Sequence, residues 1–353
     1  MSLDDLTHHL FDRARAEPTH NHLAYRSPYG YQPSRSAGIA YIVVFALLLL
    51  AHVGLGVRYK YWLVFVTLVP GTLLEVLGWA GRLWSYYSVL QVTPFLMQIS
   101  TLIIAPAFFS AWAYTVLGYC ITRLGPAYSL LSPTAYLAVF VTADIISLVI
   151  QAVGGGKAAV AAQQGTPTGS ATKIMLAGIL FQLATMTIFI ILATDFIFRV
   201  IVRKPYAHIQ KRLVKKQRKT SPSEIESAST TGNGVELKPP SSSSPGGINP
   251  VGGGVHAGGL VDLSSSGGRT EDVKKVEKLL AGVAFASAMI FVRGIYRSIE
   301  LAQGWTGYLI THEPYFIYLD GLPMVLCLAA FVVSHPGWLL PKRQGWRMAQ
   351  NAQ

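Results

Sequence analysis

Seven stretches of the chain are almost entirely apolar, and polar residues are concentrated between them and at both ends. Each stretch has about the 17 to 25 residues that a helix needs to cross a hydrocarbon core of about 30 Å. The pattern therefore predicts an all-α fold, a polytopic membrane protein built as a seven-transmembrane-helix bundle. The predicted spans are Gly38–Gly56, Trp62–Gly81, Pro94–Leu117, Pro133–Val153, Ile174–Phe198, Leu279–Ile299 and Pro314–Ser334.

The spans divide the chain into five regions. Residues 1–37 form a polar N-terminal tail, 38–198 hold five spans, 279–335 hold the last two, and 336–353 form a C-terminal tail. Residues 199–278 open with the basic stretch "RVIVRKPYAHIQKRLVKKQRK" and continue into "SSSSPGGINPVGGGVHAGG". The second stretch cannot bury enough apolar surface to fold, so we expect a disordered linker. The basic stretch either contacts anionic lipid headgroups or serves only as a topology signal.

The distribution of lysine and arginine predicts the orientation. Both are more frequent in the first, third and fifth loops and in the C-terminal tail, and such an excess marks the cytoplasmic side. We therefore expect the N-terminal tail to be extracellular and the C-terminus to be cytoplasmic. With 51% hydrophobic and 13% charged residues, the net charge of +12 is expected to anchor loops at the membrane, not to bind nucleic acid.

Charged and amide side chains interrupt the spans. An Arg, Lys or Asp at a helix centre costs about 2.5 to 3.5 kcal/mol, so such groups pair, face the bundle interior or line water. Arg293, Arg297 and Glu300 have the i, i+4, i+7 spacing of one helix face. Ten such side chains, in the spans or directly next to them, are our candidates: Glu75, Arg82, Gln98, Asp144, Gln151, Gln182, Arg293, Arg297, Glu300 and Asp320.

Two interpretations of these polar residues remain open. In the first, a near-neutral network of ion pairs between helices only fixes how the helices pack. In the second, the residues line an outward-facing polar cavity that receives the head group of an amphipathic molecule. Most of them fall in the half of the span that we expect to lie nearer the outside, and Asp144 falls near the middle.

The chain also contains, in this order, the motifs "EVLGWAGR", "QISTLIIAPAFFSAWAY", "VTADIISLVIQAVGGG", "AGILFQL", "RGIYRSIELAQG", "HEPYFIYLDGLPM" and "SHPG". Together they resemble the fungal lipid-translocating exporter family, RTA-like seven-span proteins related to aminocholesterol-resistance and sphingoid long-chain-base export proteins. The resemblance implies a multi-pass plasma-membrane protein linked to lipid transport, efflux and drug resistance. The substrates that the resemblance implies are amphipathic molecules, namely sphingoid long-chain bases, sterol-like toxicants or, in some relatives, porphyrins.

The family pattern falls on all ten polar residues of the spans and adds Tyr296 to the candidate substrate-binding residues. It also covers the pair His312 and Glu313 at the membrane surface, where we expect a helix cap or a salt bridge. Trp79 stands where the family pattern leads us to expect a tyrosine or a similar ring.

The chemistry of a sphingoid base suits these residues. Its cationic amine needs carboxylates, for which Asp320, Glu75 and Asp144 are candidates, and its hydroxyls need uncharged partners, for which the three glutamines are candidates. Arg293 and Arg297 would keep the acids ionised or bind a phosphate on a phosphorylated lipid. The alkyl chain can stay among membrane lipids.

Other classes of protein remain as alternatives. The sequence has no G-x-x-x-x-G-K-[ST] loop and no H-x-x-x-H or H-E-x-x-H pair, so no cofactor, metal site or catalytic residue is predicted. A seven-span lipid receptor or sensor fits the same number of spans. An intramembrane lipid hydrolase is a less favoured alternative, because the zinc ligands that it needs have no matching pattern.

Overall fold

The computed structural model describes residues 27–164, 166–220, 267–304 and 307–339. Within these residues it contains seven helical segments that are long and apolar enough to cross a membrane, and no strand. The predicted all-helical fold with seven candidate spans is therefore confirmed. Most of the predicted tails, and the Ser/Gly/Pro-rich stretch predicted to be a disordered linker, lie outside the described residues.

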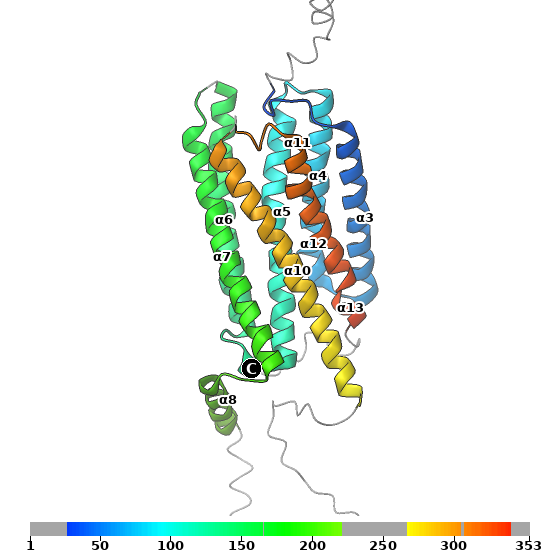
Figure 1. Ribbon diagram of the computed structural model, residues 1–353, viewed down its shortest axis with the longest axis vertical. Coiled ribbons are helices and arrows are strands. Elements are labelled where there is room, and N and C mark those ends of the chain that lie inside the picture. The colour runs from blue at the N-terminus through cyan, green and yellow to red at the C-terminus, as the bar shows by residue number, and fades with distance from the viewer. Residues whose placement is uncertain (1–26, 165, 221–266, 305–306, 340–353) are drawn as a thin grey trace, which may run out of the picture.

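The elements follow one another as an up-and-down bundle (Figure 1). The end where the first span begins is here called the upper end, and the opposite end the lower end. The first six spans are α3 (Arg35–Tyr59), η1 (Trp62–Phe65) with α4 (Leu68–Tyr87), α5 (Val92–Leu124), α6 (Pro133–Gln164), α7 (Gly169–Val202) and α10 (Gly267–Gln303). The seventh joins α11 (Glu313–Phe316), η3 (Ile317–Gly321), α12 (Leu322–Val333) and α13 (Pro336–Leu339). Two short elements lie at the lower end, η2 (Pro126–Tyr128) and α8 (Ala207–Thr220).

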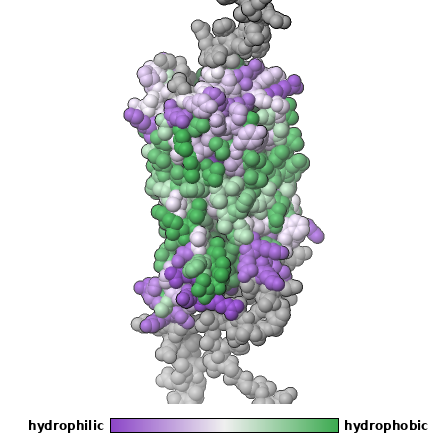
Figure 2. Space-filling model, viewed as in Figure 1, coloured by the Kyte–Doolittle hydropathy of each residue, from purple (hydrophilic) through white to green (hydrophobic). Residues whose placement is uncertain are grey.

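An apolar belt surrounds the middle of the bundle, and hydrophilic residues gather at both ends (Figure 2). Large apolar side chains on this belt are well exposed, for example Leu47 at 62%, Leu50 at 67% and Ile191 at 61%. Lipid chains are as apolar as leucine, so this exposure carries no hydrophobic penalty in a bilayer. The surface therefore fits an integral multi-pass membrane protein.

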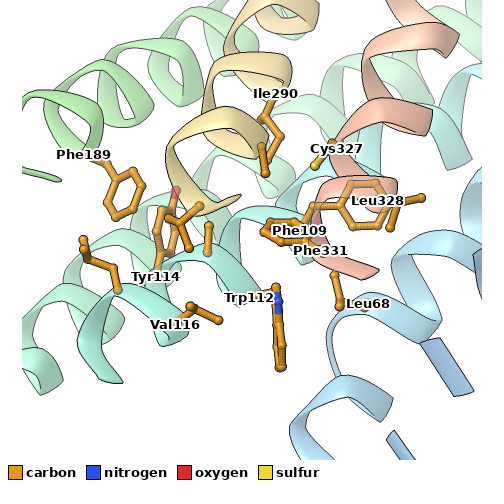
Figure 3. Close-up of a cluster of buried hydrophobic side chains, with 14 of the residues drawn as sticks. Leu68, Phe109, Trp112, Tyr114, Val116, Phe189, Ile290, Cys327, Leu328 and Phe331 are labelled. Atoms are coloured by element: carbon orange, nitrogen blue, oxygen red, sulfur yellow. The ribbon is translucent and has the colours of Figure 1, made fainter. Parts of the chain in front are cut away.

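The α10 helix runs obliquely through the bundle and packs against α5, α7 and α12 (Figure 1). The α4 and α5 helices approach closely at Gly78, where a Cβ atom would lie only 2.4 Å from the Leu102 side chain. Rings of Phe109, Trp112 and Tyr114 fill part of the interior beside α12 and α7 (Figure 3). Small residues that let helices approach are typical of membrane bundles.

Two helix irregularities lie beside the predicted site. Pro106 is inside α5, where a proline removes one backbone hydrogen bond. The η3 segment is a π-helical turn that contains Asp320 and leads into Pro323 in the first turn of α12. Single π-turns inside helices are frequent at functional sites.

Candidate functional site

Arg293 on α10 is the centre of a cluster of buried charges. Its Nε donates to Oδ1 of Asp320 at 2.8 Å, its Nη1 donates to Oε1 of Glu75 at 3.1 Å, and its Nη2 donates to the carbonyl oxygen of Leu102 at 2.5 Å. Both carboxylates and the guanidinium are almost fully buried. One side chain therefore joins α10 to α4, α5 and η3.

Arg297 extends this cluster by one turn of α10. Its Nε donates to Oδ1 of Asp320 at 2.5 Å, and its Nη1 donates to Oε2 of Glu300 at 2.8 Å. The hydroxyl of Tyr296 donates to the other oxygen of Glu300 at 3.0 Å. The predicted ion pairs between helices are thus present: Arg293 and Arg297 pair with Glu75 and Asp320 of other elements, and Arg297 also pairs with Glu300 of its own helix. We call the following six residues the charged cluster: Glu75, Arg293, Tyr296, Arg297, Glu300 and Asp320.

Arg82 is not part of the charged cluster, because it pairs with a carboxylate of α11. Its Nη2 donates to Oε1 of Glu313 at 2.9 Å and to the hydroxyl oxygen of Tyr31 at 2.6 Å. The same Glu313 oxygen accepts the backbone N–H of Ser34 at 2.7 Å. A salt bridge was one of the two roles predicted for Glu313. The chain before α3 is in this way tied to α4 and α11.

Aromatic rings lie between Arg82 and the charged cluster. The ring centre of Phe316 is 4.4 Å from the guanidinium carbon of Arg82 and 5.1 Å from that of Arg297. The hydroxyl of Tyr29 donates to Oε1 of Gln98 at 2.8 Å, and burial raises the pKa of Tyr29 to about 12. Burial also raises the pKa of Tyr31. Both tyrosines therefore stay protonated at neutral pH and act as hydrogen-bonding groups above the charged cluster.

Gln151 and Gln182 meet between α6 and α7. The amide nitrogen of Gln151 lies 3.1 Å from Oε1 of Gln182 and 2.5 Å from the hydroxyl of Ser147, which donates to the carbonyl oxygen of Gly178 at 2.8 Å. A Cβ atom on Gly178 would lie 2.6 Å from the Gln151 side chain. The glycine therefore allows the approach that brings the two amides together.

Asp144 on α6 is separate from the charged cluster. It is 4% exposed, and its Oδ2 accepts a hydrogen bond from the hydroxyl of Tyr114 at 3.1 Å. Within the described residues its Oδ1 has no hydrogen-bond partner, and no Lys, Arg or His nitrogen lies within 4.0 Å of it. Among the buried carboxylates of the described spans, Asp144 therefore differs from Glu75, Asp320 and Glu300, which pair with arginines.

A cleft of about 50 Å³ lies between α5, α6, α7 and α10. Its lining is mostly apolar, and its polar members are Ser110, Gln151, Gln182, Arg293 and Arg297. One nitrogen of Arg297, Nη2, is buried and has no hydrogen-bond partner in the described part of the chain. A volume of this size holds a few water molecules or a small polar group. A smaller pocket of about 10 Å³ near Tyr29, Arg82 and Gln98 holds about one water.

The eleven candidate residues thus fall into four places. Six form the charged cluster, namely Glu75, Arg293, Tyr296, Arg297, Glu300 and Asp320. Gln151 and Gln182 line the cleft, Arg82 and Gln98 lie above the cluster, and Asp144 stands apart. Within the described residues no group of three His, Cys, Asp or Glu side chains is placed to hold a metal ion.

Sequence reasoning missed several residues that complete these places. Ser147 could have been found, because it lies four residues before Gln151 and so on the same helix face. Tyr114 gave no signal, since a tyrosine on an apolar helix is usually part of the core. Tyr29 and Tyr31 lie outside the apolar stretches, where no periodic pattern marks them.

One family model and several named proteins are similar to the chain. The family model described as RTA1 like protein matches residues 68–343. The chain is 33% identical to the sphingoid long-chain base transporter RSB1 of Saccharomyces cerevisiae over 317 residues, which cover 89% of this chain and 74% of that protein. It is 25% identical to the protein RTM1 (76% and 66% covered) and 24% identical to the protein RTA1 (77% and 65% covered), both of Saccharomyces cerevisiae. No solved structure is significantly similar to the chain.

Proposed function

The chain belongs to the RTA1-like family, and from this premise we propose that it moves or extrudes amphipathic lipids, with sphingoid long-chain bases as the main substrates. We place it in the plasma membrane of a fungal cell, where it gives resistance to these molecules. The relative RSB1, which carries the name of a transporter, supports a transport role over a catalytic one. The observation that carries the proposal is a cleft among the apolar helices whose mostly apolar lining includes five polar side chains.

The proposed position of the substrate amine is at Asp144. A cationic amine that leaves water needs a carboxylate whose charge is not already compensated. Glu75 and Asp320 pair with Arg293, and Asp320 pairs with Arg297 as well, so each of these acids already has a cationic partner. Among the described residues, the one hydrogen-bond partner of the Asp144 carboxylate is the neutral hydroxyl of Tyr114. An amine next to Asp144 would therefore gain a charge-assisted hydrogen bond that the other acids already make.

The proposed partners of the substrate hydroxyls line the cleft. Gln151, Gln182 and Ser110 each carry groups that can donate and accept hydrogen bonds. The buried Nη2 of Arg297 can only donate, so it suits a hydroxyl oxygen or a phosphate oxygen of the ligand. The charged cluster then supports the wall of the cleft, because Arg293 and Arg297 belong to both.

Reconstitution in liposomes tests the function directly. We expect purified protein to increase the movement of a labelled sphingoid base between the two leaflets above the rate in protein-free liposomes. An uncharged alcohol with the same alkyl chain serves as the matched control, since it lacks the amine that Asp144 would bind. Saturable binding of the base without any increase in movement would contradict transport and favour the lipid receptor.

The proposed orientation places the lower end in the cytoplasm. Exposed basic residues gather there at Arg58, Arg203, Lys204, Lys211 and Arg212, as expected for the cytoplasmic side. A tag inserted in residues 221–266 should be detected only after the cells are permeabilised, and a tag before Gly38 should be detected on intact cells. The reverse pattern would show that the bundle is inverted and that the upper end faces the cytoplasm. The basic α8 would in the proposed orientation lie near anionic headgroups.

A further inference from the structure

A second cavity lies below the cleft, between α5, α7 and α10. Its volume is about 130 Å³, and its wall is apolar apart from the hydroxyls of Thr194 and Ser287. A cavity of about 150 Å³ lined by Leu, Ile and Phe stays dry and admits a benzene molecule. The second cavity is therefore large enough for a segment of an alkyl chain.

The cleft and the second cavity follow the same pair of helices. On α7 the cleft ends at Met186 and the cavity begins at Phe189, and on α10 the cleft ends at Ile290 and the cavity begins at Ser287. Three residues correspond to about 4.5 Å along a helix axis. The two spaces are thus stacked, with the polar one above the apolar one.

Tyr114, the hydrogen-bond partner of Asp144, lies beside one lining residue of each space. The hydroxyl of Tyr114, which donates to Asp144, is 3.8 Å from the sulfur of Met186, and its ring centre is 4.6 Å from that of Phe189 (Figure 3). Met186 has three rotatable bonds and fills gaps adaptably, so it can move without a backbone change. A substrate amine at Asp144 would lie near the point where the two spaces meet. The rest of the head group would then occupy the cleft above, and the alkyl chain would occupy the second cavity below.

We propose that the second cavity is the binding site for the alkyl chain of the lipid whose head group occupies the cleft. This inference rests on the proposed function and adds to it where the chain lies. The exposed side chains of Thr194 and Ala284 form the outer edge of the cavity, so the rest of a long chain passes between α7 and α10 into the bilayer. The lipid then enters from the side of the bundle, with its chain toward the lower end.

Filling the cavity tests the inference. Ala193 is small, only 9% exposed and part of the wall, so Ala193→Phe should occupy the space of the chain. We expect transport of a long-chain base to fall by about tenfold or more, as pockets discriminate by such factors for small changes in volume. A short-chain amine with the same head group should keep its rate. Ala184→Phe, on the exposed face of the same helix, is the matched control and should leave both rates unchanged.

Folding is checked by the abundance and melting temperature of each variant. If Ala193→Phe does not fold, Ala284→Trp fills the cavity from its exposed edge. If a folded variant loses transport of the long and the short substrate equally, or loses neither, the proposed binding site for the alkyl chain is wrong.

Photolabelling separates this inference from the proposed function. A sphingoid base with a photoactivatable group in the part of its alkyl chain next to the head group should label residues 189–197 and 280–287 of the full-length protein. Labelling of these residues without any transport would support the second cavity as the alkyl-chain site and contradict the transport function. Transport with labelling only at other residues would contradict the alkyl-chain site and leave the transport function standing.

Discussion

Replacing Arg293 by methionine is expected to remove most of the folded protein from the membrane. The guanidinium compensates Glu75 and Asp320 and also binds the carbonyl oxygen of Leu102, all in the bundle interior. Removal of one partner from a buried ion pair costs about 3 to 5 kcal/mol, because the remaining charge stays desolvated. That cost is a large part of the stability of an ordinary protein. The measurements are membrane abundance and the melting temperature in detergent.

Two controls make the Arg293→Met result specific. Arg58→Met changes an exposed arginine at the end of α3 and should leave the abundance unchanged. Adding Glu75→Gln and Asp320→Asn to Arg293→Met removes the stranded charges and should recover part of the folded protein. Normal abundance of Arg293→Met alone would mean that the charged cluster contributes little to folding.

Asp144→Asn is expected to leave the protein folded and to weaken its handling of a cationic base by about 10- to 100-fold. The amide can still accept the hydrogen bond from Tyr114, so the local structure keeps its partner. What is lost is the charge, and hydrogen bonds to charged groups contribute about 1.5 to 3 kcal/mol. Each 1.4 kcal/mol is a factor of ten in affinity. Initial rates in liposomes at several concentrations of the base give this factor.

The controls for Asp144→Asn separate charge from structure. Asp195→Asn changes a half-exposed acid at the lower end that pairs with Arg199, and such surface pairs contribute about 1 kcal/mol or less. It should keep the wild-type rate. An uncharged alcohol with the same chain should be moved equally by the wild type and by Asp144→Asn. Equal losses for the base and the alcohol, or no loss for the base, would exclude Asp144 as the site of the amine.

The helices and the main ion pairs could be predicted because they depend on position along one helix. Long apolar stretches gave the seven spans, and the spacing of Arg293, Arg297 and Glu300 placed three charges on one face of α10. An unpaired charge inside a membrane is costly, so the sequence also predicted that these arginines pair with acids on other helices. The structure supplies Glu75 and Asp320 as those acids.

The rest depends on how each helix is rotated about its axis, which the sequence does not show. Arg82 pairs with Glu313 above the charged cluster, and Asp144 accepts a hydrogen bond from Tyr114, with no arginine nitrogen of the described residues within 4.0 Å. The position of the cleft also follows from rotation, because Gln151 and Gln182 meet only where Gly178 lets α6 and α7 approach. These arrangements are set by contacts between helices far apart in the sequence.

The contacts of the chain before α3 bear on where the folding unit begins. Tyr29, Tyr31 and Ser34 precede the first apolar stretch, so the apolar pattern assigns them to the polar N-terminal tail. Each nevertheless makes a hydrogen bond to a residue of another helix. A chain truncated at the start of the apolar stretch would lose these three anchors and leave Arg82 with one partner fewer. Shortened or fused versions made for expression therefore need to keep the chain from Tyr29 onward.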